Sequence, residues 1–402
     1  MKGTPVHNDS TDLAQVTGHA ARTTAVIVAA KRLPNAKAGG AYKHIRAHDL
    51  AAAVIKPLVA DNDVLPQDIN DVILGNATGG GGNMARLAAL SAGLPHHVPG
   101  LTVDRQCGSG LEAIVLACRL VQAGAGELYV AGGVESISTA PARAHRHPDG
   151  TLEFYRRAQF SPLELGDPDA GVAAENVATH YAISRSRQDA YALESHRRAV
   201  AATAQGRFAQ ELVPFESLAA DQGPRHNLNA ALMARFPPVF VPGGTVTAGN
   251  SCPDSDGAAV VVVTSLAKAR RMGAAGLLFR DSAVTGNDPN LLGVGAAHST
   301  RELMARTGLS SAALGTSLIE FNEAFAAQVL AVADLLGLDP QLFNHDGGAL
   351  ALGHPYGASG AVSVTRLLAQ ARRNDEPGRT AVAMISMAGG MGISAQFQWV
   401  KL

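Results

Sequence analysis

One of the three cysteines in this 402-residue chain occupies a position that suits a catalytic nucleophile. Cys107 lies between a predicted strand, 101–103, and a predicted helix that opens with Gly108-Ser109-Gly110. The positive end of a helix dipole stabilises a thiolate, and glycines allow a substrate carbonyl to approach backbone N–H groups, as an oxyanion hole requires. Cys107 is therefore a candidate nucleophile. On these residues alone, a buried structural cysteine is the alternative.

The other two cysteines give weaker signals. Cys118 lies on the apolar face of the helix that follows Cys107, which predicts a core position, and Cys252 follows Asn250-Ser251 in a predicted loop. Because no pair has the spacing of metal ligands, we expect no metal site. An odd and low cysteine count does not indicate a secreted disulfide framework.

A histidine and an asparagine could assist the thiol. His354 stands between Gly353 and Pro355-Tyr356-Gly357, which predicts a histidine held at a rigid strand-to-helix turn. Asn322 precedes a helical pattern whose apolar face includes Phe325, and an ordinary N-cap explains Asn322 by itself.

The elements that must position these residues alternate along the chain. An apolar run at 25–30 predicts a strand buried on both faces, 48–60 predicts a helix, and 71–75 predicts a second buried strand. This alternation favours an α/β protein with a largely parallel sheet. Residues 1–23 are polar and lack the apolar core of a signal peptide, so we expect a flexible N-terminal extension.

The chain also carries an internal repeat. After Cys107, a Ser-Gly pair opens a helix that leads to a strand and to Ala131-Gly132-Gly133. Near the C-terminus, Ser359-Gly360 opens a helix that leads to a strand at 381–385 and to Ala388-Gly389-Gly390. The repeat predicts two similar halves related by a pseudo-two-fold axis, which would place the His354 turn opposite Cys107. A chance match of common small residues is the alternative.

The segment 137–251 between the halves is different in character. Its helix at about 185–205 is polar and carries Arg185, Arg187, Arg197 and Arg198. This surface suits an anionic ligand, and a solvated helix face is the alternative.

Composition excludes several classes of function. The chain has 33 basic and 34 acidic side chains, and this balance argues against nucleic acid or an acidic membrane surface as the main partner. No apolar run is long enough to span a membrane. The glycine run 79–82 lacks a P-loop ending, and no βα turn shows the full dinucleotide fingerprint.

Taken together, the chain from about residue 24 to its end resembles the thiolase family. The matching segments are Cys107-Gly-Ser-Gly-Leu, Ala131-Gly-Gly-Val-Glu135-Ser, Gly244-Thr-Val-Thr-Ala-Gly-Asn250 with Asp256-Gly-Ala-Ala, Asn322-Glu-Ala-Phe-Ala-Ala-Gln328, and Gly347-Gly-Ala-Leu-Ala-Leu-Gly-His354-Pro. Their order and spacing make the match specific.

The resemblance implies an α/β fold of the five-layered αβαβα type, built from two βαβαβαββ halves plus a loop domain. The N-terminal half would be 24–136, completed by 252–275, and the C-terminal half would be 276–402. The loop domain, 137–251, would bind coenzyme A, and its basic surface would meet the nucleotide phosphates.

The resemblance also implies catalytic roles. Cys107 would attack an acyl-CoA thioester and carry the acyl group, and His354 would polarise Cys107 and bind the thioester oxygen with a water held by Asn322. Backbone N–H groups of Cys107 and Ala388 would form a second oxyanion hole, and Phe325 would line the acyl pocket.

One departure from the family affects the chemistry. Thiolases carry a second cysteine, the acid/base that moves the α-proton, where this chain has Ser386. A serine is a much weaker acid than a thiol of pKa about 8.5 and is a poor base without an activator. Ser386 is either an introduced replacement or a natural residue that weakens or redirects the carbon–carbon step. If another residue serves as the base, Cys252 and Glu323 are the first suspects.

Two further departures concern the substrate. Ala170 stands where short-chain biosynthetic members usually carry methionine, which predicts a wider acyl pocket. The run Ser251-Cys252-Pro253-Asp254 replaces a common Ala-Ser-Gly-Leu sequence, so contacts of Ser251 and Cys252 with coenzyme A are affected.

The leading interpretation is a thiolase that cleaves 3-ketoacyl-CoA with coenzyme A, or runs the reverse Claisen condensation, through an acyl-cysteine. The alternatives are a thiolase-like acyltransferase that passes the acyl group to another acceptor, and a catalytically silent acyl-CoA-binding protein. We expect acyl-CoA and coenzyme A as substrates, no tightly bound cofactor, no nucleic acid or membrane partner, a homodimer or homotetramer, and a cytoplasmic location.

Overall fold

Buried strands and amphipathic helices alternate through the chain in a computed structural model that describes residues 13–62 and 64–402. The strands are β1 Ala25–Arg32, β2 Ala36–Lys37, β3 Asp71–Gly75, β4 Gly100–Val103, β5 Leu128–Glu135, β6 Arg143–Arg146, β7 Leu152–Tyr155, β8 Ser255–Ser265, β9 Gly276–Gly286, β10 Leu318–Phe321, β11 Thr380–Met387 and β12 Met391–Val400.

The α-helices are α1 Gly18–Arg22, α2 Ala47–Ala60, α3 Met84–Ser91, α4 Ser109–Gln122, α5 Ala170–His180, α6 Arg185–Ala204, α7 Ala230–Met233, α8 Leu266–Arg271, α9 Gly295–Thr307, α10 Ser311–Gly315, α11 Ala326–Leu336, α12 Ala349–Leu352 and α13 Ser359–Asn374. Short 3₁₀ turns are η1 Leu13–Gln15, η2 Pro66–Asp68, η3 Ile137–Thr139, η4 Leu163–Leu165, η5 Pro289–Val294, η6 Pro340–Leu342 and η7 Tyr356–Ala358.

The N-terminal half contains the complete βαβαβαββ unit. Its strands lie in the order β4-β3-β5-β8-β1. The pairs β3·β4 and β3·β5 are parallel, whereas β8 runs antiparallel to both β5 and β1. The alternating side chains of β8 are buried on both faces, as the run of valines from Val260 to Val263 requires.

The C-terminal half repeats this arrangement with one reduction. Its strands lie in the order β10-β11-β12-β9, with β10·β11 parallel and β12 antiparallel to β11 and β9. A fifth strand is represented only by an isolated bridge between Phe343 and Ile319. The predicted thiolase-type α/β fold is therefore confirmed, with a shorter outer edge in the second half.

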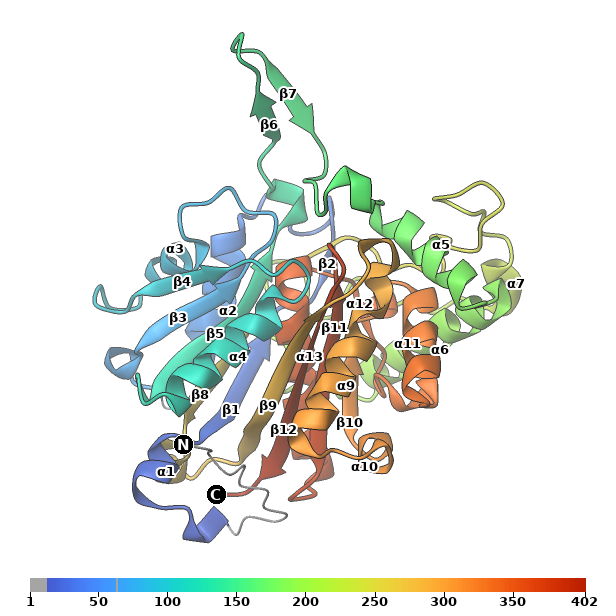
Figure 1. Ribbon diagram of the computed structural model, residues 1–402. Helices are drawn as coiled ribbons and strands as arrows, with labels where there is room; N and C mark the ends of the chain where they lie inside the picture. The colour runs from blue at the N-terminus through green and yellow to red at the C-terminus, as the bar shows by residue number, and fades with distance from the viewer. Residues whose placement is uncertain (1–12, 63) are drawn as a thin grey trace.

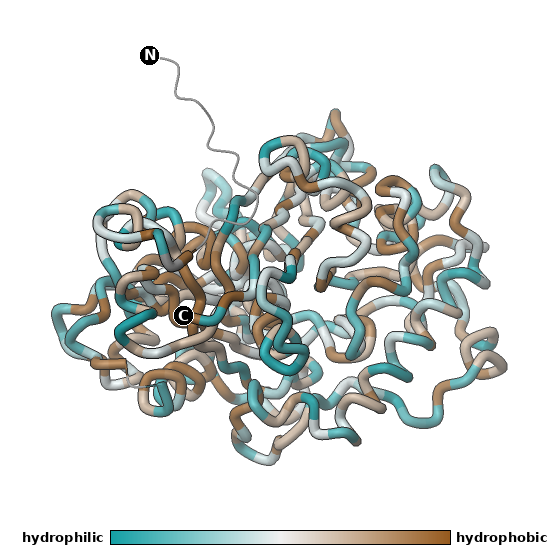
Figure 2. The backbone as a smooth tube through the Cα atoms, turned by 90° about the horizontal axis from the view of Figure 1, so that it is seen from below, coloured by the Kyte–Doolittle hydropathy of each residue, from teal (hydrophilic) through white to brown (hydrophobic). Residues whose placement is uncertain are grey.

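Three helical layers enclose the two sheets. The sheets meet edge to edge at two residue pairs of β1 and β9, Val26 with Leu278 and Ile27 with Leu277. Helices α4 and α13 pack side by side against strands of both halves, α2 and α3 cover the outer face of the first half, and α9 and α11 cover that of the second. Hydrophobic stretches gather in the interior of the body, as Figure 2 shows.

Glycines allow the two central helices to meet at their N-termini. A Cβ added to Gly110 would lie 2.7 Å from the Gly357 carbonyl oxygen, and one added to Gly360 would lie 2.3 Å from the Leu111 nitrogen. Because these distances are too short for any side chain, both positions require glycine. The starts of α4 and α13 therefore face each other, and the Cys107 turn lies opposite the His354 turn.

The repeat seen in the sequence is only partly a structural repeat. Ser109 and Ser359 both open central helices, but Ala131-Gly132-Gly133 lies inside β5, whereas Ala388-Gly389-Gly390 forms the turn between β11 and β12. A Cβ at Gly133 would lie 1.9 Å from the Gly357 carbonyl oxygen, so this glycine serves helix–sheet contact rather than a turn.

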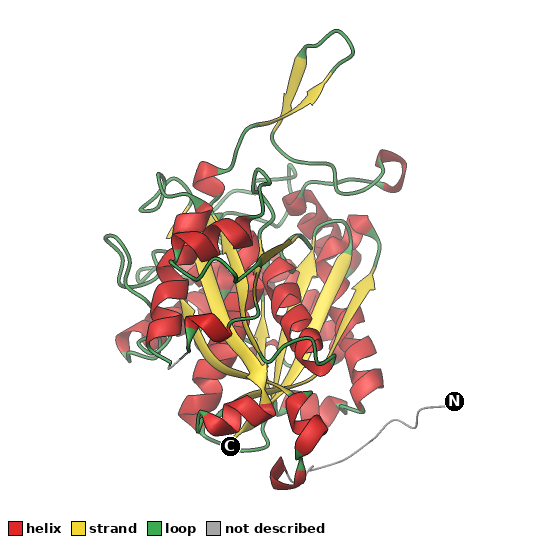
Figure 3. Ribbon diagram, turned by 90° about the vertical axis from the view of Figure 1, so that its left-hand side faces the viewer, coloured by secondary structure: helices red, strands yellow, loops and turns green. Residues whose placement is uncertain are grey.

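The segment between the halves forms α5, α6, α7 and a two-stranded hairpin, β6–β7, which projects from the body in Figures 1 and 3. No helix in the described part of the chain is long and apolar enough to cross a membrane.

The expected extension, 1–23, is partly folded. Residues 1–12 lie outside the described part, while η1 and α1 form short helices beside α8. Arg270 of α8 donates to the carbonyls of Leu13 and Val16, so this stretch differs from the mobile segment that its polar composition predicts.

Candidate active site

Cys107 lies in the turn that leads from β4 into α4, and its thiol is half-buried. Burial, and then the Glu135 carboxylate, raise the pKa of Cys107 to about 12, against the opposing effect of backbone N–H groups of Cys107 and Ala388. The thiol is therefore protonated at rest, contrary to the thiolate that its helix position predicts. The two N–H groups nevertheless converge on its sulfur, as the second oxyanion hole would require.

His354 is almost fully enclosed, with 2% of its surface exposed. Its backbone N–H contacts the Pro253 carbonyl and the Ser255 hydroxyl, each at 3.2 Å. Gly353, with φ of +100°, turns the chain just before it. Burial lowers the pKa of His354 to about 4, so the imidazole is neutral at pH 7 and can accept a proton.

Hydrogen bonds favour one tautomer of this imidazole. His354 Nδ1 lies 2.6 Å from Ser359 Oγ, and that hydroxyl is also 3.1 Å from the Pro355 carbonyl, to which it donates. Because the Ser359 hydroxyl donates its proton to the Pro355 carbonyl, its oxygen can only accept from His354, so Nδ1 carries the hydrogen and is the donor. Nε2 then carries the lone pair, which accepts from the Asn322 amide nitrogen at 3.4 Å.

Asn322 is buried beside His354, and it is not the N-cap that its sequence position predicts. Helix α11 begins at Ala326 with Phe325 as its N-cap, and Gln328 Oε1 accepts from the Phe325 N–H at 3.2 Å. The Asn322 backbone is held separately, since its N–H donates to Met384 and its carbonyl accepts from Gln328. Its side-chain amide is thereby left to face His354.

Residues 251–254 form a strap across the site. The Cys252 N–H donates to the Ala324 carbonyl at 3.0 Å, and Ser251 forms a backbone bridge with Phe325. The same strap contacts His354 through the Pro253 carbonyl. Ser251 Oγ donates to the Thr247 carbonyl at 2.7 Å, so its hydroxyl is occupied within the loop.

Ser386 is buried in β11, and its hydroxyl has two backbone partners. Ser386 Oγ donates to the Gly293 carbonyl at 2.7 Å and accepts from the Ala296 N–H at 3.0 Å. The next residue, Met387, lies on the other face of the strand, where a Cβ on Gly108 would come within 2.2 Å of its sulfur. The Ser386 hydroxyl proton is therefore used in a hydrogen bond to the backbone where η5 meets α9, and it is not available to a substrate in this arrangement.

The residues predicted to line the acyl pocket are Ala170 and Phe325. Phe325 and Phe240 form a pair of aromatic rings, here called the aromatic wall. Ala170 is exposed as the first residue of α5. The ring of Phe240 packs over the neighbouring Gly171, where a Cβ would lie 2.2 Å from it, and meets Phe325 edge to face at 6.0 Å. The structure thus brings Phe240 beside Phe325, which sequence reasoning missed.

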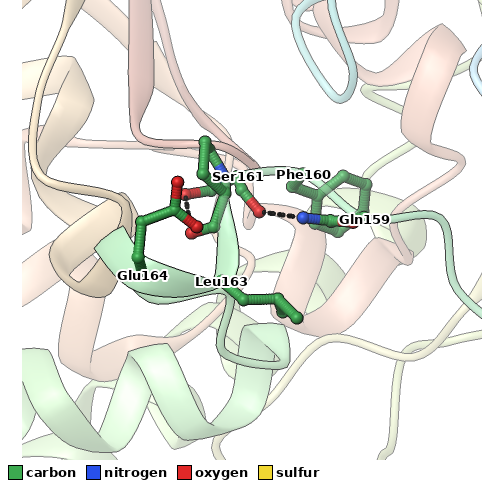
Figure 4. A pocket seen from close by; sticks show the side chains of 6 residues that line it. Gln159, Phe160, Ser161, Leu163 and Glu164 are labelled. Atoms are coloured by element: carbon green, nitrogen blue, oxygen red, sulfur yellow. Dashed lines mark hydrogen bonds between the residues drawn. The ribbon is translucent and has the colours of Figure 1, made fainter.

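A shallow cavity of about 560 Å³, wide open to solvent, lies along residues 159–164 (Figure 4). The Phe160 carbonyl lies 3.2 Å from the position of a Cβ on Gly389, one residue from Ala388, so the cavity borders the second oxyanion hole. Gln159 donates to the Ser161 carbonyl at 2.8 Å and helps to shape this loop. The sequence indicated a loop here, but nothing in it indicated a cavity.

Glu135 is a second residue that sequence reasoning left without a role. Its carboxylate accepts from the Asn76 amide, from the backbone of Ala77 and Thr78, from the Thr78 hydroxyl, and from the Gly357 N–H at 2.9 Å. It is fully buried and ties the N-terminal half to the turn that holds His354.

The arginines of α6 do not form a free cationic surface. Each pairs with a carboxylate: Arg185 with Asp189, Arg187 with Asp334, and both Arg197 and Arg198 with Glu194. These pairs make the helix surface less cationic than its arginines alone indicate, and the expected phosphate-binding role of the helix stays a prediction. Arg225, whose guanidinium lies over the Phe236 ring, has no carboxylate partner within the described residues.

Metal binding is not indicated by the arrangement. Across residues 13–62 and 64–402, no group of three histidine, cysteine or acidic side chains is placed to hold a metal ion. The polar groups that converge here are a thiol, an imidazole, an amide and two backbone N–H groups.

Comparison with known proteins agrees with this geometry. The families described as thiolase N-terminal domain and thiolase C-terminal domain match residues 25–267 and 274–399. The YhfS protein of Bacillus subtilis, provisionally named an acetyl-CoA C-acetyltransferase, is 45% identical over 377 residues, covering 93% of this chain and 99% of the relative. The VraB protein of Staphylococcus haemolyticus, with the same provisional name, is 43% identical over 384 residues, covering 93% and 98%.

A solved structure leads to the same assignment. The crystal structure of the Bacillus anthracis acetyl-CoA acetyltransferase aligns with a TM-score of 0.88 at 34% identity, covering 94% of this chain and 99% of that one. The two matched domains, the sequence relatives and this structural similarity confirm the resemblance inferred from the motifs: the chain belongs to the thiolase family.

Proposed function

We propose that this chain is an acyl-CoA acyltransferase that cleaves 3-ketoacyl-CoA with coenzyme A, or runs the reverse Claisen condensation, through an acyl group on Cys107. The observation that carries the proposal is the convergence of the Cys107 and Ala388 N–H groups on a half-buried thiol, in a turn that lies opposite the turn holding a neutral, buried histidine. Two N–H donors and a base are what acyl transfer to a thiol requires.

The first step is transfer of the acyl group to the thiol. His354 Nε2 accepts the Cys107 proton as the sulfur attacks the thioester carbonyl, and the coenzyme A thiolate leaves. A base is needed because the Cys107 pKa lies far above neutral pH. The protonated Nε2 and a water held by Asn322 then face the thioester oxygen, while the two N–H groups stabilise the oxyanion formed at Cys107.

Acyl-CoA and coenzyme A are the substrates we propose, since the relatives are named for acetyl-CoA chemistry. We assign no tightly bound cofactor. With the four arginines of α6 paired, Arg225 is the cation we place against the nucleotide phosphates. The strap residues Ser251 and Cys252 and the aromatic Phe325 would border the thioester end.

We propose a homodimer or a dimer of dimers. Strand β4 is an edge of the sheet, and beside it the side chains of Leu87, Leu90 and Leu101 are 40–43% exposed. An unpaired strand edge with apolar side chains is a favourable surface for pairing with a second copy. Three free cysteines suit a reducing compartment, and we propose the cytoplasm.

The acyl-carrier role is tested by intact-mass measurement after mixing with acetyl-CoA. One acetyl mass should appear on the wild-type protein and should be lost in Cys107→Ala, while Cys118→Ala, which removes a thiol from the core, should retain it. An adduct that persists in Cys107→Ala would overturn the assignment. A 3-ketoacyl-CoA thiolysis assay then separates a thiolase from an acyltransferase that uses another acceptor.

A further inference from the structure

The carbon–carbon step needs a group that moves a proton, and the residue predicted for it is engaged elsewhere. The Ser386 hydroxyl donates to Gly293 and accepts from Ala296, and both bonds join β11 to the turn before α9. To take a proton from a substrate, Ser386 would have to lose these bonds and ionise far above neutral pH. The site therefore requires another acid or base.

The nearby carboxylates are equally committed. Glu323 Oε1 accepts from Tyr191 and Asn344, and its Oε2 accepts from Ser195 and from the Leu350 N–H. Glu135 accepts from five donors, as described above. A carboxylate saturated in this way is a structural anchor and has no lone pair directed at the substrate.

Cys252 lies in the strap, residues 251–254, and not on the strand that carries Ser386. Its backbone is bonded to Ala324, two residues from Asn322, and the following residue, Pro253, bonds to His354. The charge of a Cys107 thiolate raises the pKa of Cys252, and both thiols act on Tyr356. The ring of Tyr356 stacks edge to face with His354 at 5.1 Å and its hydroxyl donates to Asp254, so the strap that carries Cys252 lies against the turn that holds His354.

We propose that Cys252 is the second thiol of the reaction, the acid that protonates the departing coenzyme A and the base that removes the α-proton. This assignment rests on the proposed function. It places the proton shuttle on the strap that borders the thioester rather than on the strand position of Ser386.

The steps balance without any further reagent. During loading, Cys107 passes its proton to His354 Nε2 as its sulfur forms a bond to the acyl carbon, the bond to the coenzyme A sulfur breaks, and Cys252 gives its proton to that sulfur. The Cys252 thiolate then takes the α-proton of a second acyl-CoA, whose carbanion attacks the acyl group on Cys107 and expels the Cys107 thiolate, which recovers its proton from His354. Thiolysis is the same sequence in reverse.

The surroundings of Cys252 suit the resting acid. Burial, followed by the charges of Asp254 and Cys107, raises the pKa of Cys252, so it begins the cycle with its proton. The titratable groups that act on it are Asp254, whose carboxylate accepts from the Tyr356 hydroxyl, Cys107 and Glu323. The thiol gives up its proton only while the departing coenzyme A thiolate lies beside it, and the Cys252 thiolate, whose conjugate acid has the higher pKa, is then the stronger base for removing the α-proton.

Hydrogen exchange isolates this step. The wild-type protein, incubated with acetyl-CoA in D₂O, should introduce deuterium at the acetyl methyl group, because the α-proton is removed and returned without carbon–carbon bond formation. Cys252→Ala should lower this rate by about a hundredfold or more, the scale of a general base. Cys118→Ala is the matched control for loss of a thiol and should match the wild type.

Acetyl loading on Cys107 is measured on the same samples. An adduct should still form in Cys252→Ala, more slowly than in the wild type, because coenzyme A can also leave as its thiolate; its formation would show that the variant is folded and that the proposed function stands. Exchange within threefold of wild type in Cys252→Ala would overturn the proposal, as would loss of exchange in Ser386→Ala with exchange retained in Cys252→Ala. Absence of any Cys107 adduct would instead overturn the proposed function.

The proximity of the thiols has its own test. Phenylarsine oxide forms a stable ring only with two neighbouring thiols, so the wild-type protein and Cys118→Ala should each gain one arsenic adduct that resists a monothiol wash. Cys107→Ser and Cys252→Ser should each lose it. An adduct that survives in Cys252→Ser would contradict the paired arrangement.

Discussion

His354 Nδ1 lies 2.6 Å from the hydroxyl of Ser359, five residues further along the chain and at the first position of α13. The hydroxyl also contacts the Pro355 carbonyl, so its single proton decides which imidazole nitrogen carries hydrogen. Ser109 has a similar place at the start of α4, where its hydroxyl donates to the Gln106 carbonyl and accepts from the Arg105 N–H. The two halves thus use equivalent serines to fix the two catalytic turns.

Ser359→Ala should slow acetyl loading without removing it. The change deletes one hydrogen bond to His354, worth about 1 kcal/mol, or roughly fivefold in rate, because the tautomer with an unprotonated Nε2 is no longer favoured. Stopped-flow loading of Cys107 measures the effect, and Ser359→Thr, which keeps the hydroxyl, should recover most of it. Equal rates in all three proteins would contradict a positioning role.

Stability should fall as pH is lowered from about 6.5 towards 4. The pKa of His354 is about 4 when folded and about 6.5 when unfolded, so the unfolded chain binds more protons between these values. The neutral form therefore stabilises the fold fully above pH 6.5, and this contribution, on the order of 3 kcal/mol, is lost as pH falls through that window.

Urea unfolding at pH 7 and pH 5 measures this dependence. His196, whose pKa burial also lowers to about 4, contributes with the same sign, so a single substitution should remove only part of the slope. In His354→Asn the difference in free energy of unfolding between the two pH values should be smaller than in the wild type. An unchanged difference would mean that His354 is already hydrated or charged.

The fold, and the placement of Cys107 and His354 in turns at the starts of helices, were predictable because they depend on local chemistry. Strand runs such as 25–30 and the glycine-flanked turns at Cys107 and His354 determine their own structure. The pairing of these turns followed from the repeated Ser-Gly helix starts, since close helix approach needs glycine on both sides.

Tertiary contacts explain what the sequence did not predict. Asn322 has the residue type of an N-cap, but Gln328 closes the start of α11 on Phe325 instead. Among the arginines of α6, only Arg187 has a carboxylate partner, Asp334, that lies far away along the chain. The other partners, Asp189 and Glu194, lie three or four residues from their arginines within the helix, a spacing that the sequence alone contained. Ser386 and Gly293 are also far apart along the chain, so the hydrogen bond that holds the Ser386 proton could not be inferred from the sequence.

Longer acyl chains should load better than acetyl, because Ala170 leaves the first turn of α5 small and exposed beside the aromatic wall. Each methylene that becomes buried contributes about 0.8 kcal/mol, so octanoyl-CoA should exceed acetyl-CoA several-fold in loading efficiency. Ala170→Met should narrow the difference. A strict acetyl preference that this substitution leaves unchanged would refute the wide pocket.

Charge on the β4 edge should weaken the proposed dimer. Leu101 is 43% exposed on this strand, and a lysine there would place a charge where a second copy is expected to pair. Light scattering should show Leu101→Lys shifted towards monomer at micromolar concentration. Leu65→Lys, an exposed leucine outside the β4 edge, is the control and should leave the mass unchanged.

Ser386→Ala should lower stability more than it lowers acyl loading. The alanine leaves the Gly293 carbonyl and the Ala296 N–H buried without their side-chain partner, and each such group costs about 1–3 kcal/mol. Loading depends on Cys107, His354 and backbone N–H groups, none of which is bonded to Ser386. We therefore expect a midpoint of urea unfolding that is clearly reduced and an acetyl adduct on Cys107 that still forms at low temperature within a few-fold of the wild-type rate. A Ser386→Ala protein of unchanged stability with loading reduced a hundredfold would show that the hydroxyl serves the reaction and not the junction of β11 with α9.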